Sequence, residues 1–135
     1  MELRNALVLV VLAAAAASAC GESTVLPPPS SPTALRVDLH TPNTDDGAIV
    51  ITLRGPDLSN LQPGSAGYLA YFRAASTEET RVIVVGDLNT GALVTLSIAA
   101  GHQLSDYSAT VEQVASRTDV LRADLSAYRV ELSAP

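Results

Sequence analysis

The residues best suited to nucleophilic or metal chemistry in this chain of 135 residues are Cys20, His40 and His102. A zinc site normally needs three or four ligands from cysteine, histidine and carboxylates. With one cysteine and two histidines available, His40 and His102 would have to converge with carboxylates, and we expect both as exposed loop residues instead. No serine lies in a Gly-x-Ser-x-Gly nucleophile elbow. The sequence therefore predicts no catalytic residue, no metal ligand and no cofactor, and the protein is expected not to be an enzyme.

Two acidic loops raise the question of calcium. Asp87 and Asn89 open a segment like an EF-hand loop, but Gly91 falls at loop position five and position twelve is an isoleucine. An EF-hand has glycine at position six and glutamate at position twelve. A hairpin turn explains the segment better, because Asn and Gly tolerate a positive φ. Asp45 and Asp46 lie together in a second loop, where we also expect a plain turn. Calcium binding at either loop stays an open alternative.

Aromatic rings on which a sugar could stack are few. The chain has no tryptophan, and its rings are Tyr68, Tyr71, Phe72, Tyr107 and Tyr128. Alternation along a strand puts Tyr68 and Phe72 on one face and Tyr71 with Leu69 on the other. We expect core packing to take most of these rings, with Tyr128 a core or edge residue. The ligand-binding residues of a carbohydrate module cannot be named from this pattern.

The charge of the chain argues against nucleic acid as a partner. The formal net charge is −6, and all eight basic residues are arginines. An acidic domain repels a phosphate backbone, and no basic stripe offsets that repulsion.

The N-terminal segment has the features of an export signal. Residues 6–17 are an uncharged apolar run preceded by Arg4. This run of 12 residues is shorter than the roughly 20 that a spanning helix needs, but it fits the apolar region of a signal peptide. Ala17 and Ala19 also satisfy an ordinary signal peptidase, which prefers small residues at positions −3 and −1. Residues 1–19 are therefore predicted to be a signal peptide.

The stretch Ala17-Ser18-Ala19-Cys20 resembles a bacterial lipobox, although leucine is usual where Ala17 stands. A single unpaired cysteine in an exported chain needs an explanation, and lipidation of Cys20, with palmitate among the acyl chains, would provide one. The resemblance implies a lipoprotein attached to a membrane of the cell envelope. Gly21 after the cysteine favours the outer membrane over retention in the inner one. Secretion is the alternative, if an ordinary signal peptidase cleaves the chain.

Behind Cys20, residues 20–33 are predicted to be a tether. They are rich in proline, serine and threonine, and such segments favour an extended polyproline II conformation that rises about 3.1 Å per residue. A tether of this length could hold a domain up to roughly 40 Å from the lipid.

Residues 34–135 are predicted to form an all-β domain. Short β-branched and apolar runs alternate with turn residues, and the predicted strands are 35–39, 48–53, 68–72, 80–85, 93–98, 107–114 and 127–132. About seven such strands with regular turns predict an antiparallel β-sandwich. Residues 114–125 have some helical character, and we expect at most one short helical turn there. The strand count resembles immunoglobulin-like sandwiches, and residues 91–98 are similar to an internal strand of cohesin-like ones.

From these features we expect a lipid-anchored, non-catalytic envelope protein whose domain serves protein interaction, adhesion or scaffolding. The first alternative is a ligand-binding module for carbohydrate or calcium. The second is a small hydrolase, which would need His40 or His102 within hydrogen-bond reach of a carboxylate in a pocket. The sequence names neither an envelope protein partner nor an oligomeric state.

Overall fold

Alternating apolar side chains build most of the strands. In β1 (Thr33–His40), Leu35, Val37 and Leu39 are buried while the residues between them reach the surface. This period of two is what a strand covered on one face requires. The computed structural model describes residues 33–135. The predicted signal peptide 1–19, Cys20 and the tether as far as residue 32 lie outside the described residues.

The described part of the chain contains eight strands and one short 3-10 helix, η1. The remaining elements in chain order are β2 (Asp46–Arg54), β3 (Ser59–Pro63), β4 (Leu69–Ala74), β5 (Glu79–Leu88), β6 (Gly91–Ile98), η1 (Leu104–Asp106), β7 (Ser108–Ser116) and β8 (Arg129–Ser133). No helix within residues 33–135 is long and apolar enough to cross a membrane.

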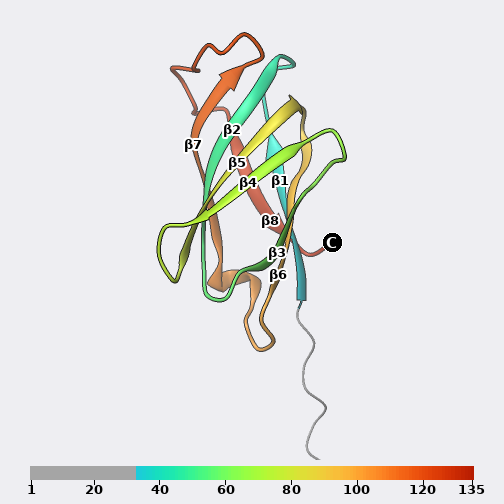
Figure 1. The fold of residues 1–135 in the computed structure, drawn as a ribbon, viewed down its shortest axis with the longest axis vertical. Helices are drawn as coiled ribbons and strands as arrows, with labels where there is room; N and C mark the ends of the chain where they lie inside the picture. The colour runs from blue at the N-terminus through green and yellow to red at the C-terminus, as the bar shows by residue number, and fades with distance from the viewer. Residues whose placement is uncertain (1–32) are drawn as a thin grey trace, which may run out of the picture.

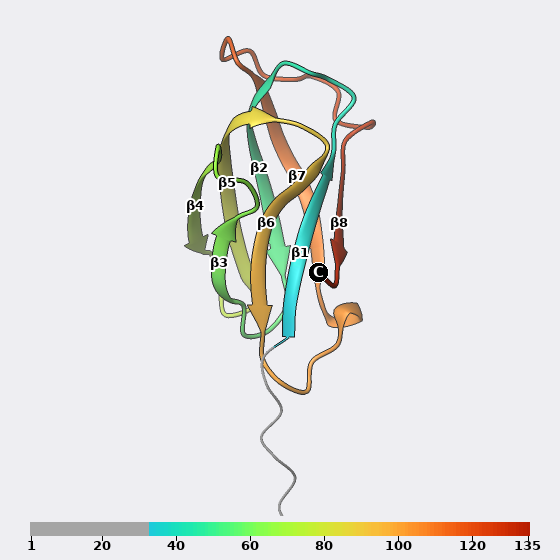
Figure 2. The same ribbon diagram turned by 90° about the vertical axis from the view of Figure 1, so that its right-hand side faces the viewer.

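The strands form two four-stranded antiparallel sheets packed face to face (Figures 1 and 2). The order is β3-β6-β1-β8 in one sheet and β4-β5-β2-β7 in the other. The predicted all-β antiparallel sandwich is confirmed, with eight strands where about seven were expected. Thr33 lies at the lower end of the sandwich in Figure 1, and the long connection between β7 and β8 lies at the upper end.

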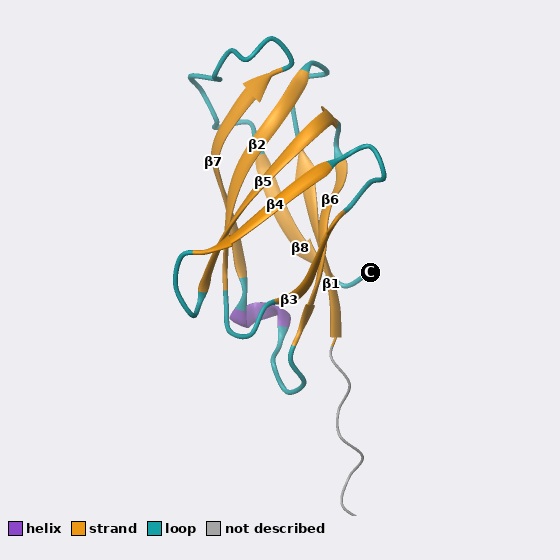
Figure 3. Ribbon diagram, viewed as in Figure 1, coloured by secondary structure: helices purple, strands orange, loops and turns teal. Residues whose placement is uncertain are grey.

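The additional strand is β3, which sequence analysis missed because it lacks a β-branched apolar run. It reads Ser-Asn-Leu-Gln-Pro and pairs irregularly with β6. The segment 114–125, expected to hold at most a short helical turn, contains the end of β7 and part of a loop. Figure 3 shows the helical turn of the described residues at the lower end of the sandwich instead, at η1.

Most connections carry the chain from one sheet to the other. The predicted hairpin at residues 86–91 is therefore wrong: β5 and β6 belong to different sheets, although only Asn89 and Thr90 separate them. Backbone and side-chain bonds between Thr41 and Thr90 hold this crossing in place. Within residues 33–135, β4 and β5 are the only consecutive strands that pair with each other.

The core lies between the two sheets. Val37 and Leu93 of one sheet and Ile51 and Val82 of the other are fully inaccessible to solvent. Burial of each such side chain is worth about 1.5–3 kcal/mol relative to exposure. Inside the described domain no disulfide contributes to this, so the core must hold the two sheets together.

Gly55 closes the lower end of the core. It has φ +144°, a conformation that side chains rarely adopt, and its α-carbon lies against the ring of Tyr107. The Tyr107 hydroxyl donates to the carbonyl of Pro56 at 2.9 Å. Burial raises the pKa of this phenol, and the nearby Asp106 carboxylate raises it further. Tyr107 thus ties the start of β7 to the end of β2.

We predict that Gly55→Ala lowers the free energy of unfolding by about 3 kcal/mol, because the new methyl group overlaps a buried ring in a strained backbone conformation. Urea denaturation followed by circular dichroism measures this. Gly67→Ala is the matched control, since nothing lies within 4 Å of the added carbon, and it should change stability by less than about 0.5 kcal/mol. Equal effects of the two substitutions would contradict the packing described here.

Candidate functional site

Asp46, at the start of β2, is a carboxylate enclosed by the protein. It is 1% exposed. Its oxygens accept hydrogen bonds from the Thr41 hydroxyl at 2.5 Å, the Tyr128 hydroxyl at 2.9 and 3.0 Å, and Arg122 Nε at 3.0 Å. No buried side-chain nitrogen or oxygen within residues 33–135 lacks a partner. The Asp46 charge is therefore both balanced and hydrogen-bonded, as a buried charge must be.

Arg122 and Tyr128 extend this polar network. The Arg122 guanidinium also reaches Asp45 at 2.5 Å, and its hydrogen bond to Asp46 raises its pKa above the ordinary value. Burial raises the pKa of Tyr128 above 10, and the Asp46 carboxylate adds to that shift. The Asn43 amide donates to the Tyr128 hydroxyl at 2.6 Å. Tyr128 is thus a core residue with a specific partner 82 positions away in the chain.

The two acidic loops considered for calcium are occupied by arginines. Arg122 pairs with Asp45 and Asp46, and Arg117 pairs with Asp87 at 2.8 Å. Between residues 33 and 135 no three side chains of His, Cys, Asp or Glu gather closely enough to share a metal ion. A cation would have to displace a guanidinium at either loop, so these contacts favour a structural role for the carboxylates.

The histidines lie apart from each other. His40 Nε2 is 3.8 Å from Glu131 at the exposed end of β1. His102 is half-buried against Tyr107, with its nitrogens 3.7 and 3.8 Å from Asp57 and Asp106. Hydrogen-bond reach for proton transfer is about 2.6–3.2 Å. Neither histidine therefore has the contact that the hydrolase alternative requires.

Most of the aromatic rings pack in or against the core, as predicted. Tyr107 and Tyr128 are buried, and Tyr68 packs against the core. Tyr71 points outward and is 60% exposed, whereas Phe72 lies on the other face of β4 and is 37% exposed. A sugar-binding surface with two rings on one face is thus not formed by β4.

Tyr71 belongs to an apolar surface that we call the β4–β5 face. This face consists of the outward side chains of the β4–β5 pair, which are the cross-strand pairs Leu69–Val85, Tyr71–Ile83 and Arg73–Arg81. Of its four apolar members, Leu69 is 63% exposed, Tyr71 60%, Ile83 40% and Val85 39%. Contiguous apolar surface of this kind commonly marks a site of protein association. Val50 of β2, which pairs with Ile83, extends it toward the middle of the sheet.

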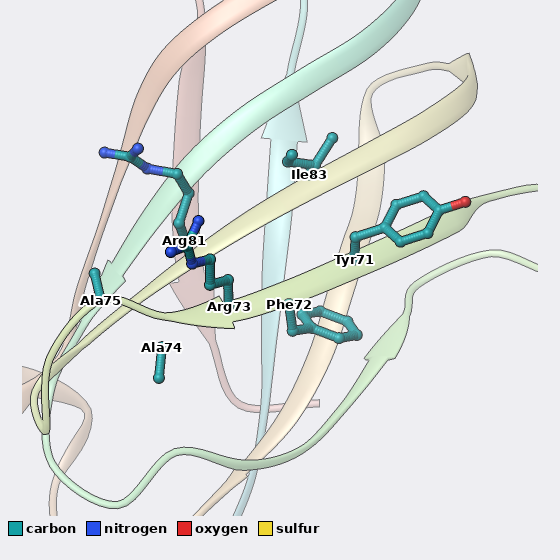
Figure 4. A pocket seen from close by; sticks show the side chains of 7 residues that line it. All are labelled: Tyr71, Phe72, Arg73, Ala74, Ala75, Arg81 and Ile83. Atoms are coloured by element: carbon teal, nitrogen blue, oxygen red, sulfur yellow. The ribbon is translucent and has the colours of Figure 1, made fainter.

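Two arginines border this apolar surface. Figure 4 shows Arg73 and Arg81 together at one end of the strand pair, with Tyr71 and Ile83 further along it. Like charges directly opposite each other on paired strands are destabilising. In the described part of the chain neither arginine has a carboxylate within 4.0 Å, whereas Arg36 and Arg54 each have one. Arg73 and Arg81 are therefore free to bind an external anion.

The same residues line a surface hollow of about 710 Å³. Its lining includes Tyr71, Arg73, Arg81 and Ile83 from the outward face, and Phe72 and Ala74 from the other face of β4 (Figure 4). Because side chains from both faces of β4 take part, the hollow reaches the free edge of that strand. The site thus combines an apolar face, two cations and an open strand edge.

Comparisons with protein-family models, with curated proteins and with solved structures find no significant match to this chain. The assignment of a function must therefore come from the site itself. Sequence analysis placed Tyr71 and Leu69 on one face but missed Arg73, Arg81, Ile83 and Val85. The alternation within β5 could have indicated which residues face outward, but their register against β4 could not be read.

We predict that Asp46→Ala lowers the free energy of unfolding by about 3 kcal/mol, because it leaves Arg122 and Tyr128 without their shared acceptor. Thermal or urea unfolding measures the loss. Glu78→Ala removes an exposed carboxylate that has no ion-pair partner among the described residues, and it should shift stability by less than about 0.5 kcal/mol. A loss for Asp46→Ala as small as for Glu78→Ala would show that the polar network contributes little.

Proposed function

We propose that this chain is a lipid-anchored, non-catalytic protein of the bacterial cell envelope, and that its β-sandwich binds another protein through the β4–β5 face. The observation that carries the proposal is the exposure of Leu69, Tyr71, Ile83 and Val85 as two adjacent cross-strand pairs. These side chains take no part in the core, so the fold does not need them to be apolar. Covering them with a partner would remove apolar surface from water at about 25 cal/mol per Å².

A protein partner fits this face better than a small ligand does. Small-molecule sites enclose most of the ligand, whereas the hollow beside Tyr71 is open to solvent and continues along two paired strands. Interfaces are enriched in tyrosine and arginine, and Tyr71, Arg73 and Arg81 supply both residue types. A single outward ring also gives a sugar little to stack on.

The anchor in this proposal is Cys20, and it rests on the lipobox-like sequence. The tether 20–33 would leave the lipid and lead to Thr33 at the lower end of the sandwich (Figure 1). On this arrangement β4 and β5 lie along the side of the domain, and their outer face is open to a neighbouring envelope protein. The outer membrane is the proposed location.

If Cys20 carries the lipid, Cys20→Ser will abolish incorporation of radiolabelled palmitate into the protein in the producing cells. The same variant will move the protein from the membrane fraction to the soluble envelope or culture fraction. Ser18→Ala should label like the wild type, because a small residue is kept at that position. Equal labelling of the wild type and Cys20→Ser would contradict the anchor.

A photoreactive benzoylphenylalanine at position 71 should give a defined cross-linked product with one envelope protein in intact cells. The same group at position 131, which is exposed on the other sheet, should not. Ile83→Asp should remove the product formed at position 71, because it places a charge on the cross-strand neighbour of Tyr71. Absence of any product at position 71, or its persistence in Ile83→Asp, would contradict binding through this face.

A further inference from the structure

We propose that β4 is a docking strand: an extended, carboxylate-bearing segment of another protein pairs with its free edge and adds a fifth strand to the sheet β4-β5-β2-β7. This inference rests on the proposed function, and it specifies the geometry and the chemistry of the partner. Addition of a strand to a sheet edge is an established form of peptide recognition, in which backbone hydrogen bonds give affinity and side chains give specificity.

The backbone pairing shows which groups of β4 are free. Ala75 N–H donates to the carbonyl of Glu79 at 2.8 Å. Because hydrogen-bonded pairs alternate along an antiparallel ladder, the residues that exchange bonds with β5 are Arg73, Tyr71 and Leu69. The N–H and C=O groups of Ala70, Phe72 and Ala74 therefore point away from the sheet. A second contact supports this assignment. On the β2 side of β5, Gly55 N–H donates to the carbonyl of Glu78 at 2.9 Å, so the even-numbered residues of β5 bond to β2 and the odd-numbered ones to β4.

The other three edge strands, β3, β7 and β8, have features that hinder pairing with a strand of another chain. β3 contains Pro63 and an irregular register, and β7 is interrupted by two register shifts against β2. β8 is five residues long and charged at Arg129 and Glu131. β4 has a continuous register with β5 and no proline. Proteins normally block an exposed edge by such means, so β4 is the edge left open to a partner.

Charge selects the kind of segment that fits. Arg73 and Arg81 face each other without a carboxylate partner in the described domain, although the whole chain has a net charge of −6. An incoming strand with a carboxylate beside them would relieve their repulsion, and hydrogen bonds between guanidinium and carboxylate are among the stronger ones. Apolar residues of the same segment would cover Tyr71 on one face and Phe72 on the other.

A second copy of this chain fits the edge less well. The outward side chains of β4 are Leu69, Tyr71 and Arg73, and none of them is acidic. Two β4 strands paired with each other would bring four guanidinium groups to one face with no carboxylate from either strand. A β4–β4 pair therefore lacks the complementary charge, which favours a different protein as the partner.

The test uses the purified full chain in detergent, isotope-labelled for nuclear magnetic resonance, and a soluble peptide of alternating glutamate and valine. We expect saturable binding with amide shifts concentrated at Ala70, Phe72 and Ala74. A peptide of the same sequence N-methylated at every residue should not bind, because neither of its edges has N–H donors for the ladder. The double variant Arg73→Glu with Arg81→Glu should bind the glutamate peptide at least tenfold more weakly, and it should bind a lysine–valine peptide better than the wild type does.

The outcomes separate this inference from the proposed function. Equal binding of the N-methylated peptide would overturn strand addition. Failure of the glutamate–valine peptide to bind, while the cross-link at position 71 still forms, would overturn the acidic extended partner and leave the interacting face in place. A sedimentation experiment that shows a dimer abolished by Phe72→Pro would overturn the choice of a different protein as the partner. Loss of the cross-link itself would remove the proposed function.

Discussion

The upper end of the sandwich depends on one buried negative charge. Removing a carboxylate from water costs several kcal/mol unless it is paired and hydrogen-bonded. Asp46 meets that condition only when the 41–45 loop and the β7–β8 connection take their native positions, since the first supplies Thr41 and the second supplies Arg122 and Tyr128. The apolar core holds the sheets together, whereas the Asp46 charge fixes how the loops close over them.

The two faces of the sheet β4-β5-β2-β7 serve different purposes. Its inner face buries Ile51, Val82 and their neighbours against the other sheet. Its outer face leaves apolar pairs in water beside two arginines that have no carboxylate partner among residues 33–135, which lowers solubility and stability without contributing to the core. On the proposed function a partner covers these residues, and substitutions among them would alter binding while the fold is kept.

The local residue pattern was enough to predict most of the strands. It did not reveal which strands pair with each other over long distances in the sequence. The alternation in residues 35–39 and the β-branched run in residues 80–85 identified β1 and β5, because one-sided burial imposes a period of two. Asn89 and Gly91 indicated a tight turn but not that it crosses between sheets, since turn residues do not encode the partner of the next strand. For the same reason nothing distinguished the buried Asp46 from the exposed Asp45, and the pairing of Arg73 with Arg81 required the register.

The crossing connections have a kinetic consequence. A hairpin forms in about 1–10 μs, whereas sheets built from distant segments assemble in milliseconds to seconds. β4 and β5 are the only strands of the described domain that pair with a chain neighbour, so this hairpin can close while the other six strands still search for their places. The strand edge that would receive a partner is then exposed before the domain is complete. On the proposed function, a folding chain would expose the free edge of β4 first, and early binding of the partner would compete with self-association of partly folded copies.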